Sequence, residues 1–393
     1  MHVLILGARA PACLEWARIC CAAGCKVSVA DALAFPITRF SAAVHRYWRL
    51  PAPRTRPQEW IAALSKLVTE LEIDLVLPTC EEVFYLSHGK QHIPADVFVP
   101  SFDWLHRLHH KGTFAHFVQN QGWPITAPET HLLHSHAETL DFCQQHHTQD
   151  WVFKPAYSRF ASQTLVRPQA DTVVQLQPTP NQPWLAQRFI QGREHCSYSL
   201  LAKGQVAAHT CYHPRYRVGQ GAGIWFEPTS PPAILDFVQR LGRLSGMTGQ
   251  IAFDFIESVD GRFYVLECNP RATSGIHLLG HEPEKLVDAL QGRSSLMHSF
   301  SEPSAPPCQV ALAMLLFAAT KHGLHRSFWR DFCAARDIIF RRDDAVPWVA
   351  QGLGVLEVLV RAATQRCGLL PATTTDIQWD GQALDVLHAT DRP

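Results

Sequence analysis

The chain has 393 residues, with 35 Lys and Arg against 35 Asp and Glu, and 47% of its residues are hydrophobic. This length predicts two or three domains. The composition excludes intrinsic disorder, which needs low hydrophobicity and high net charge, and the zero net charge argues against a protein dedicated to nucleic acids.

Targeting and membrane signals are missing from the sequence. Residues 1–7 carry neither a basic region nor an apolar stretch of signal-peptide length. The longest apolar run, 310–319, would cover about half a bilayer. We therefore expect a cytoplasmic protein with no membrane partner.

The 12 cysteines and 22 histidines form no recognisable metal motif. No two cysteines are spaced as C-x-x-C, and no H-E-x-x-H occurs, so a zinc ribbon, a thioredoxin-like motif or a histidine metal site is not expected. We expect most of the cysteines to be buried, reduced thiols.

The first elements along the chain predict a βαβ unit. A strand at 3–6 is followed by a turn at Gly7, a helix at 14–23 and a second strand at 26–30, a pattern typical of a parallel sheet. Residues 7–12 lack the later glycines of the G-x-G-x-x-G phosphate fingerprint. A dinucleotide-dependent oxidoreductase is therefore disfavoured.

The same unit continues through a helix at 60–71 and a strand at 75–78, after which Glu81 and Glu82 follow. Ligands of open α/β sheets gather at the carboxyl ends of the strands, so Glu81 is a candidate for substrate contact. The other interpretation is that these acids only stabilise a helix N-terminus. We place a Rossmann-like domain at 1–108.

The pattern changes at about residue 109. Short strands separated by polar loops run from 151 to 209, and a helix at 233–245 follows. Three prolines in 301–307 predict a linker. No motif identifies the region 299–393, in which we expect helices at 310–319, 328–335 and 353–363 and surface turns at Asp343-Asp344 and 376–381.

The segment 251–271 carries the strongest local signal. Asp260-Gly261 between alternating hydrophobic residues predicts a two-residue hairpin turn. That turn places Asp254 directly opposite Glu267 and Asn269 on the same face as Glu267. Two opposed carboxylates destabilise a hairpin unless a cation compensates them. The alternative is an exposed hairpin whose acids face water.

Two carboxylates and an amide oxygen are hard ligands that suit Mg²⁺ or Mn²⁺. We therefore predict a metal site at Asp254, Glu267 and Asn269. Arg271 follows Pro270 and places a guanidinium beside this site, where it could stabilise a phosphate or a developing oxyanion.

At these residues the sequence resembles the ATP-grasp superfamily. Asp254 followed by Glu267-Cys268-Asn269-Pro270-Arg271 looks like the metal motif of that family. The similarity extends over residues 1–290 and is closest to the biotin carboxylase and carbamoyl-phosphate synthase-like branch, which contains amino-acid ligases. The resemblance implies an α/β and α+β fold, with a Rossmann-like pre-ATP-grasp domain (1–108), an ATP-grasp domain (109–298, small lobe 125–190, large lobe 191–298) and a mainly helical C-terminal region (299–393).

The resemblance also implies an ATP site between the two lobes. Lys111 and Lys154 match the two lysines on the phosphate side, and Glu194 is placed to accept the ribose hydroxyls. The backbone that reads the adenine edge is matched by the hinge residues Gln187, Arg188 and Ile190. From the residues alone, an ordinary buried strand that ends at Gly192 is the alternative.

The loop after Lys154 departs from the family pattern, because residues 156–163 contain no glycine and their backbone is more restricted. Ser158 and Ser162, together with backbone amides, could still cradle phosphate, and Arg159 could neutralise it.

Substrate contacts are expected in two segments. Arg215 and Arg217 lie in a basic, glycine-rich stretch, and either could bind a carboxylate bidentately; a mobile solvated loop is the alternative. Ser274, Gly275 and His277 follow the metal motif and could line an acceptor pocket, where His277 could help to deprotonate an amine.

If the resemblance holds, the protein is a ligase that uses ATP and Mg²⁺ or Mn²⁺ to activate a carboxylate as an acyl phosphate and couples it to an amine or similar nucleophile. Arg271 and Arg215 are its expected catalytic residues. The alternatives are an enzyme of the carboxylase or carbamoyl-phosphate type that uses bicarbonate, and a catalytically silent ATP-binding module. The expected partners are small-molecule substrates, and a homodimer is left open.

Overall fold

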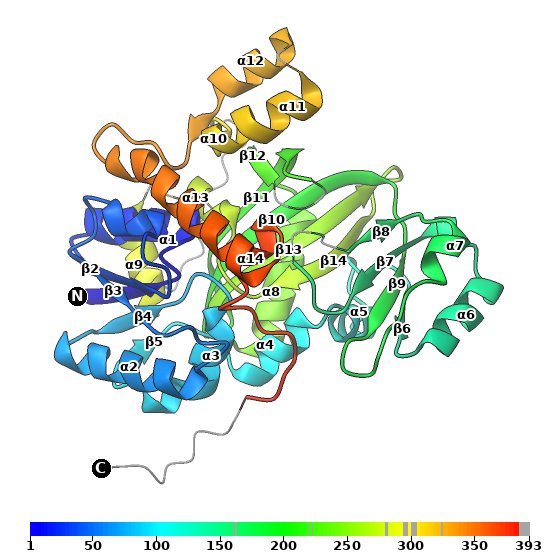
Figure 1. Ribbon diagram of the computed structural model, residues 1–393, viewed down its shortest axis with the longest axis horizontal. Coiled ribbons are helices and arrows are strands. Elements are labelled where there is room, and N and C mark those ends of the chain that lie inside the picture. The colour runs from blue at the N-terminus through cyan, green and yellow to red at the C-terminus, as the bar shows by residue number, and fades with distance from the viewer. Residues whose placement is uncertain are drawn as a thin grey trace.

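The structure is a computed structural model that describes residues 1–159, 161, 163–219, 221, 223–279, 282–293, 298–299, 305–323 and 325–384. Its strands form three sheets. Figure 1 shows the N-terminal sheet in blue on one side of the molecule, a small green sheet on the opposite side, and the largest sheet between them.

The N-terminal sheet is the parallel, Rossmann-like sheet that the sequence predicts. Its strand order is β3-β2-β1-β4-β5, with every neighbouring pair parallel. Strand β1 is buried along its whole length, as its apolar run predicts for a sheet covered on both faces. The elements are β1 (His2–Leu6), α1 (Pro11–Ala22), β2 (Lys26–Asp31), β3 (Arg46–Arg49), α2 (Pro57–Glu70), β4 (Leu75–Leu77), α3 (Glu82–Gly89), β5 (Asp96–Val97) and α4 (Phe102–His109). The predicted strands at 3–6, 26–30 and 75–78 are confirmed to within one residue.

The small sheet has the order β6-β9-β7-β8 and is antiparallel throughout. Its core is aromatic: Phe142 packs edge-on against Trp151 and Phe153, with ring centroids 5.0 and 5.7 Å apart. The elements are β6 (Thr130–Leu133), α6 (His136–Gln145), β7 (Trp151–Pro155), β8 (Leu165–Val166), α7 (Ala170–Val173) and β9 (Trp184–Arg188).

The largest sheet has the order β14-β13-β10-β11-β12-β16-β17, with β15 beside β11. Helices α5 (Lys111–Gln119), α8 (Pro232–Ser245) and α9 (Pro283–Leu290) pack against it. Its strands are β10 (Gly192–Ala202), β11 (Gln205–Arg217), β12 (Gly223–Thr229), β13 (Gly249–Ser258), β14 (Phe263–Asn269), β15 (His298–Ser299), β16 (Cys308–Gln309) and β17 (Arg336–Asp337). The region after residue 299 therefore contributes two strands to this sheet besides its helices.

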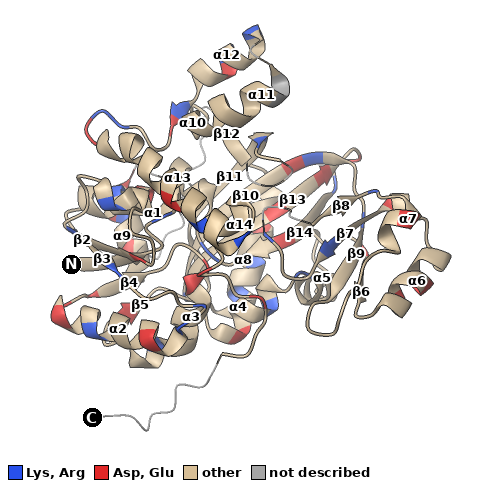
Figure 2. Ribbon diagram, viewed as in Figure 1, with Lys and Arg blue, Asp and Glu red and all other residues tan. Residues whose placement is uncertain are grey.

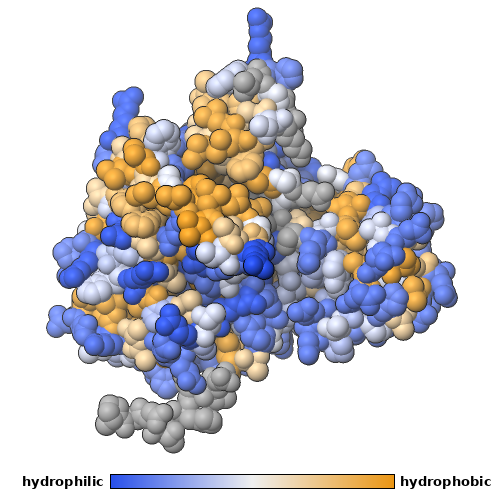
Figure 3. Space-filling model, viewed as in Figure 1, coloured by the Kyte–Doolittle hydropathy of each residue, from blue (hydrophilic) through white to orange (hydrophobic). Residues whose placement is uncertain are grey.

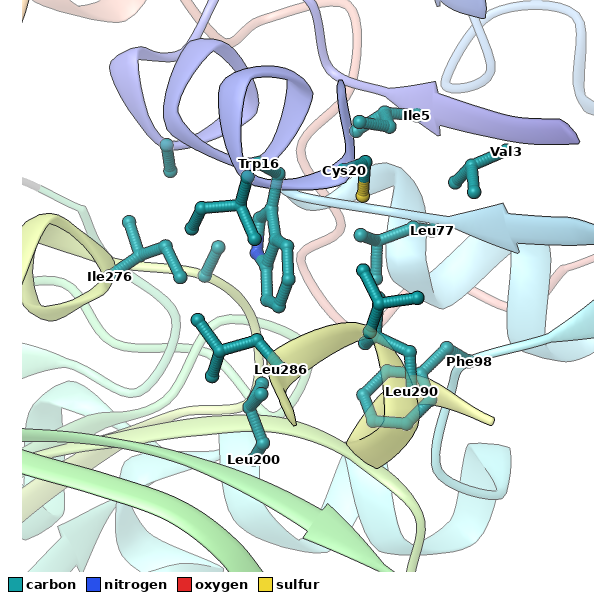
Figure 4. Packing of buried hydrophobic residues seen from close by; sticks show 14 of the residues in the cluster. Val3, Ile5, Trp16, Cys20, Leu77, Phe98, Leu200, Ile276, Leu286 and Leu290 are labelled. Atoms are coloured by element: carbon teal, nitrogen blue, oxygen red, sulfur yellow. The ribbon is translucent and has the colours of Figure 1, made fainter. Parts of the chain in front are cut away.

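One hydrophobic cluster joins the N-terminal domain to the large sheet (Figure 4). Trp16 of α1 points between Leu200 of β10 and Leu286 of α9, and its indole Nε1 donates a hydrogen bond to Gln250 (2.9 Å). The Gln250 amide in turn donates to the carbonyl of Pro78, just after β4 (2.6 Å). The carboxyl edge of the N-terminal sheet is thereby fixed against β13.

The C-terminal region is mainly helical, as predicted. Its elements are α10 (Ala311–Ala313), the π-helical turn η5 (Met314–Ala318), α11 (Ala319–His322), α12 (Arg326–Ala334), α13 (Val346–Gln365) and α14 (Leu369–Ala372). Within the described part of the chain, α13 has the length and apolar composition that a membrane crossing would need. The predicted linker lies partly outside the described residues, which omit 301–304.

Of the two predicted surface turns of this region, the one at Asp343-Asp344 is confirmed in part, since residues 342–343 form a turn with Asp343 exposed, and the one at 376–381 is wrong. Asp344 is buried because its carboxylate accepts hydrogen bonds from Arg18 (2.9 Å) and Ser41 (2.7 Å) of the N-terminal domain. In the segment 376–381, Asp376 is buried against Arg9 (2.5 Å) and Trp379 is 2% exposed. The C-terminal region therefore folds back onto the carboxyl edge of the first sheet.

Candidate functional site

The hairpin of β13 and β14 brings the two predicted metal carboxylates together. Asp254 pairs directly with Glu267, as predicted. The turn is different from the prediction, because the Ser258 amide donates to the Arg262 carbonyl (2.8 Å) and three residues, 259–261, lie between these two. Gly261 adopts a φ of 80°, the left-handed conformation that such a loop requires.

The longer turn moves the register by one residue, and a bulge moves it back. Next to the turn Glu257 pairs with Phe263, but the register shifts between Phe255 and Asp254. A bulge places one extra residue on one strand and re-aims the side chains that follow it. The opposition of Asp254 and Glu267 thus depends on the bulge rather than on a two-residue turn.

The two carboxylates differ in pKa. Burial and the neighbouring charge of Glu267 raise the pKa of Asp254 to about 6. Burial also opposes ionisation of Glu267, but the ammonium groups of Lys111 and Lys154 outweigh it and lower the pKa of that carboxyl to about 2. The pair therefore presents at least one firmly ionised carboxylate to the space in front of the hairpin.

Both predicted phosphate lysines face this pair. Lys111, the first residue of α5, places its Nζ 3.5 Å from Glu267 and donates to the Ser158 carbonyl (2.9 Å). Lys154 on β7 is buried, and burial lowers its pKa to about 8. Figure 2 shows the opposite signs on β7 and on β13 and β14. Ser158 thus contacts Lys111 through its backbone carbonyl. Ser162 lies outside the described residues.

The donor set suits a hard divalent cation. The Asn269 side-chain nitrogen donates to Asp254 (3.4 Å), and the Asn269 side-chain oxygen accepts a hydrogen bond from Arg271 (3.2 Å). Among the described residues no three His, Cys, Asp or Glu side chains gather as a metal site. A cation here would thus have two carboxylates, an amide oxygen and ligands from outside the protein, which is the usual pattern for Mg²⁺.

The predicted hinge residues connect the small sheet to β10. The Gln187 side chain is buried and donates to Thr130 of β6 (3.1 Å). The Arg188 guanidinium points outward to Asp150 (3.4 Å), and its amide N–H is bonded to the carbonyl of Glu129 (2.8 Å). Ile190 follows the end of β9. The side chains of Gln187 and Arg188 are therefore used in the small lobe.

Glu194, the predicted ribose ligand, forms an ion pair with Arg217 at a cavity of about 810 Å³. Burial lowers the pKa of Arg217, and the charges of Asp254 and Glu267 partly oppose this effect. Arg217 therefore lies close enough to the acid pair to interact with it electrostatically. Arg215 is held elsewhere: its guanidinium pairs with Asp331 of α12 (3.2 Å). The structure thus brings Arg217, and not Arg215, to the acid pair.

Glu81 is the centre of a cluster that the sequence did not predict. It is 3% exposed, and Arg159 donates to both of its carboxylate oxygens (2.6 and 2.7 Å). Arg271 approaches the same carboxylate at 3.9 Å. Arg159 also donates to the Trp379 carbonyl (2.8 Å) and pairs with Asp380. Arg159 therefore binds the N-terminal domain and the C-terminal segment, instead of extending toward a phosphate as expected.

The residues after the metal motif have packing contacts. Ser274, Gly275 and His277 lie in a short 3-10 helix, η4 (Ser274–Leu278). A Cβ on Gly275 would stand 2.3 Å from the Cβ of Tyr198. His277 is 2% exposed and hydrogen-bonds Glu15 of α1 (3.2 Å), and burial lowers its pKa. Their role in substrate binding stays a prediction.

Comparison with solved structures identifies the fold. N5-carboxyaminoimidazole synthetase from Staphylococcus aureus matches with a TM-score of 0.62 and 12% identity over 90% of this chain and 96% of that chain. L-amino acid ligase from Bacillus licheniformis matches with a TM-score of 0.56 and 16% identity over 74% and 75% of the two chains. The chain has the ATP-grasp fold. Biotin carboxylase from Campylobacter jejuni also matches, with a TM-score of 0.57 and 13% identity over 75% and 72%.

The ATP-grasp resemblance expected from the sequence is thereby confirmed at the level of the fold. Neither the protein-family models nor the curated proteins match the sequence. At identities of 12–16% the likeness to these three proteins shows the fold alone.

Proposed function

We propose that this protein is an ATP-dependent ligase that activates a carboxylate as an acyl phosphate and joins it to an amine or similar nucleophile. The observation that carries the proposal is the opposition of Asp254 and Glu267 in front of Lys111 and Lys154, on an ATP-grasp fold. Two half-buried carboxylates and two buried ammonium groups match the charges of a triphosphate with a divalent cation.

Each group has a role that follows from its position. Asp254, Glu267 and Asn269 would hold the cation, which supplies charge neutralisation at the phosphate oxygens. Lys111 and Lys154 would bind the phosphates as fixed positive charges. Arg271 bridges Asn269 and Glu81, so its guanidinium is placed to stabilise negative charge that develops on an acyl group.

The nucleotide would lie between the small sheet and the large sheet, with Ile190 and the hinge backbone at the adenine and Glu194 at the ribose. Solved structures with this fold include complexes with ADP and with MgADP, which supports this placement. Arg217, which joins Glu194 to the surroundings of the acid pair, would contact phosphate or substrate carboxylate. We expect the protein to act on small molecules in the cytoplasm.

A bicarbonate-dependent reaction is the second candidate. It is supported by the likeness in fold to biotin carboxylases, one of which is described with MgADP and bicarbonate. A silent ATP-binding module has less support, because the acid pair, both lysines and Arg271 all surround one site.

The test is ADP and phosphate release, measured with Mg²⁺ across a panel of carboxylic acids, bicarbonate and amines, together with the product mass. We expect release that depends on one acid–amine pair and is lost in Glu267→Gln. Glu70→Gln, on the exposed face of α2, is the matched control and should keep full activity. Release of AMP and pyrophosphate would exclude an acyl phosphate. Nucleotide binding without turnover across the panel would favour the silent module.

A further inference from the structure

A second concave site lies at the carboxyl edge of the N-terminal sheet. A cavity of about 670 Å³ opens between the loop after β3, the end of β2 and helix α13. Four arginines line it, Arg49, Arg54, Arg56 and Arg361, with Asp376 as its acidic residue. Ligands of open α/β sheets gather at this edge, and a basic wall selects anions.

The four lining arginines outnumber the one lining carboxylate, although Arg54 also pairs with Asp380 and Arg56 with Glu59, outside the lining. Asp376 is bound by both Arg9 (2.5 Å) and Arg361 (3.2 Å). Asp380 is bound by Arg54 (2.9 Å) and also by Arg159. Asp376, the acidic residue of the cavity, therefore shares its charge between Arg361 and Arg9, which is also paired with Asp31.

Two of the lining arginines keep unused donors. In the described part of the chain, Arg49 forms no ion pair with a carboxylate; its Nε donates to the Ala32 carbonyl (3.0 Å). The Nε of Arg361 is buried and has no hydrogen-bond partner among the described residues. A buried donor without a partner is costly, so an acceptor from outside the protein would be stabilising here.

The cavity is connected to the candidate active site by a line of alternating charges. Arg54 pairs with Asp380, Asp380 with Arg159, and Arg159 with Glu81. Glu81 lies 3.9 Å from Arg271 beside the acid pair. The backbone of Arg54 also donates to the Asp376 carbonyl (3.1 Å). Arg54 of the cavity is thereby linked through ion pairs to the carboxylate that Arg271 approaches.

We propose that this cavity binds an oxyanion with at least two negative charges, a phosphate monoester or a polycarboxylate, carried by a substrate of the proposed ligase. The planar guanidinium fork binds carboxylate and phosphate oxygens in pairs. The assignment of this anion to a substrate rests on the proposed function, whereas anion binding itself does not. The substrate of this chain would accordingly be an anionic molecule, with one charged group held away from the reacting carboxylate.

Calorimetric titration of the full chain with citrate and with glycerol 3-phosphate tests the proposal. We expect one saturable site, and about tenfold weaker binding in Arg49→Gln and in Arg361→Lys, which keeps the charge but loses the fork. Arg46→Gln is the matched control, because Arg46 lies at the other end of β3, stacked on Trp48 at 4.2 Å. Its affinity should equal that of the wild type.

The outcomes separate this proposal from the proposed function. Absence of saturable binding, or equal affinity in the Arg46 and Arg49 variants, would overturn the anion site even if MgADP binds and turns over. In turnover assays, competition of citrate or glycerol 3-phosphate with the identified acid or amine would support a substrate group. A change in kcat without competition would instead identify a free anionic effector and overturn the substrate assignment.

Helix α13 has its polar side chains on the side that faces the protein and its apolar side chains on the side that faces solvent. Its inward side holds the polar groups: the Glu357 carboxylate accepts from the amides of Ala34 and Phe35 (2.8 Å each), and Arg361 pairs with Asp376. Its outward side is apolar, with Val349 72% and Leu356 58% exposed. Figure 3 shows this side as a continuous orange surface that extends toward α10 and α11.

The size of this surface matches a protein interface. The exposed Val, Leu and Trp side chains of α13 present on the order of 700 Å² of apolar area, whereas each partner of a standard interface buries about 800 Å². A monomer typically exposes a largest apolar patch of about 300–600 Å². The inward hydrogen bonds of Glu357 hold α13 along the body of the protein, so it does not cross a membrane in this arrangement.

We infer that the outward side of α13 pairs with the same side of a second copy of this chain, in a two-fold dimer. Sedimentation of the full chain at about 10 μM should give a dimer, and Leu353→Glu with Leu356→Glu should give a folded monomer. Leu244→Glu on α8, where Leu244 is 52% exposed, is the control and should stay dimeric. A monomeric wild type would overturn the inference, as would flotation of that monomer with phosphatidylglycerol–phosphatidylcholine vesicles.

Discussion

Trp379 couples the C-terminal segment to the candidate phosphate loop, and its removal is the most direct test of that coupling. Its indole is 2% exposed and stacks on Phe84 of α3 with ring centroids 5.0 Å apart. Tyr157, from the loop after Lys154, packs against the same ring at 5.8 Å. The Trp379 carbonyl accepts from Arg159 of that loop (2.8 Å).

The cost of Trp379→Ala follows from its burial. A buried Trp removes about 200 Å² from water, which is about 5 kcal/mol at 25 cal/mol per Å². An alanine methyl retains about 1 kcal/mol of this. We therefore expect the free energy that docks the segment to fall by about 4 kcal/mol, within the range of large core truncations. Trp379→Phe keeps the stacking and loses the hydrogen bond from Nε1 to Gln382 (2.8 Å), so it should cost about 1 kcal/mol.

The measurements are urea unfolding, limited proteolysis and calorimetric titration with MgADP. Trp379→Ala should unfold at lower urea, be cleaved faster within 373–384 and bind MgADP more weakly, because Arg159 and Tyr157 lose their support. Trp379→Phe should stay close to the wild type in all three. An alanine variant with wild-type urea midpoint and wild-type MgADP affinity would refute the coupling.

Two further substitutions test the contacts around η4. Burial opposes ionisation of Glu15, but His277 and Arg341 lower the pKa of its carboxyl to about 2. The ionised carboxylate therefore adds about 3 kcal/mol to the free energy of unfolding above pH 4.5, and this contribution is lost as pH falls toward 2. Glu15→Gln should therefore unfold at lower urea than the wild type at pH 7 and converge with it near pH 2; a constant difference across this range would contradict the assignment. Gly275→Ala should cost about 1–3 kcal/mol of unfolding free energy, because its Cβ would meet Tyr198 at 2.3 Å. Gly352→Ala, in open space on α13, should be neutral or stabilising by up to about 1 kcal/mol, and equal costs for the two variants would contradict the packing role of Gly275.

The parts of the fold that sequence reasoning predicts are those set by local pattern. The apolar run of β1 and the turn residues after it predict a parallel βαβ unit, and the structure contains it. The hairpin is instructive because Asp254 and Glu267 face each other as predicted, although the predicted turn is wrong. The three-residue loop shifts the pairing by one position. A bulge at Leu266 of β14, opposite Asp254 and Phe255, shifts it back, and no local residue pattern indicates this bulge.

The contacts of Arg159 and Trp379 were not predicted, because their partners are distant in sequence. Arg159 was expected to neutralise phosphate, but it binds Glu81, 78 residues earlier, and Asp380, 221 residues later. The segment 376–381 was expected to form a surface turn from its composition, yet its apolar Trp379 fills a space that the N-terminal domain provides. A single sequence gives no signal for such pairings, since each partner is an ordinary charged or aromatic residue in its own segment.

The ion pair between Arg9 and Asp376 has a consequence for how this protein is made. The two residues are 367 positions apart. At a synthesis rate of about 5–20 residues per second, Asp376 is therefore made on the order of 20–70 s after Arg9. During that time Asp31 is the carboxylate available to form an ion pair with Arg9, and the arginines that follow β3 face solvent. The carboxyl edge of the first domain is thus completed only after the segment around Asp376 has been synthesised, which ties assembly of the candidate site to that late segment.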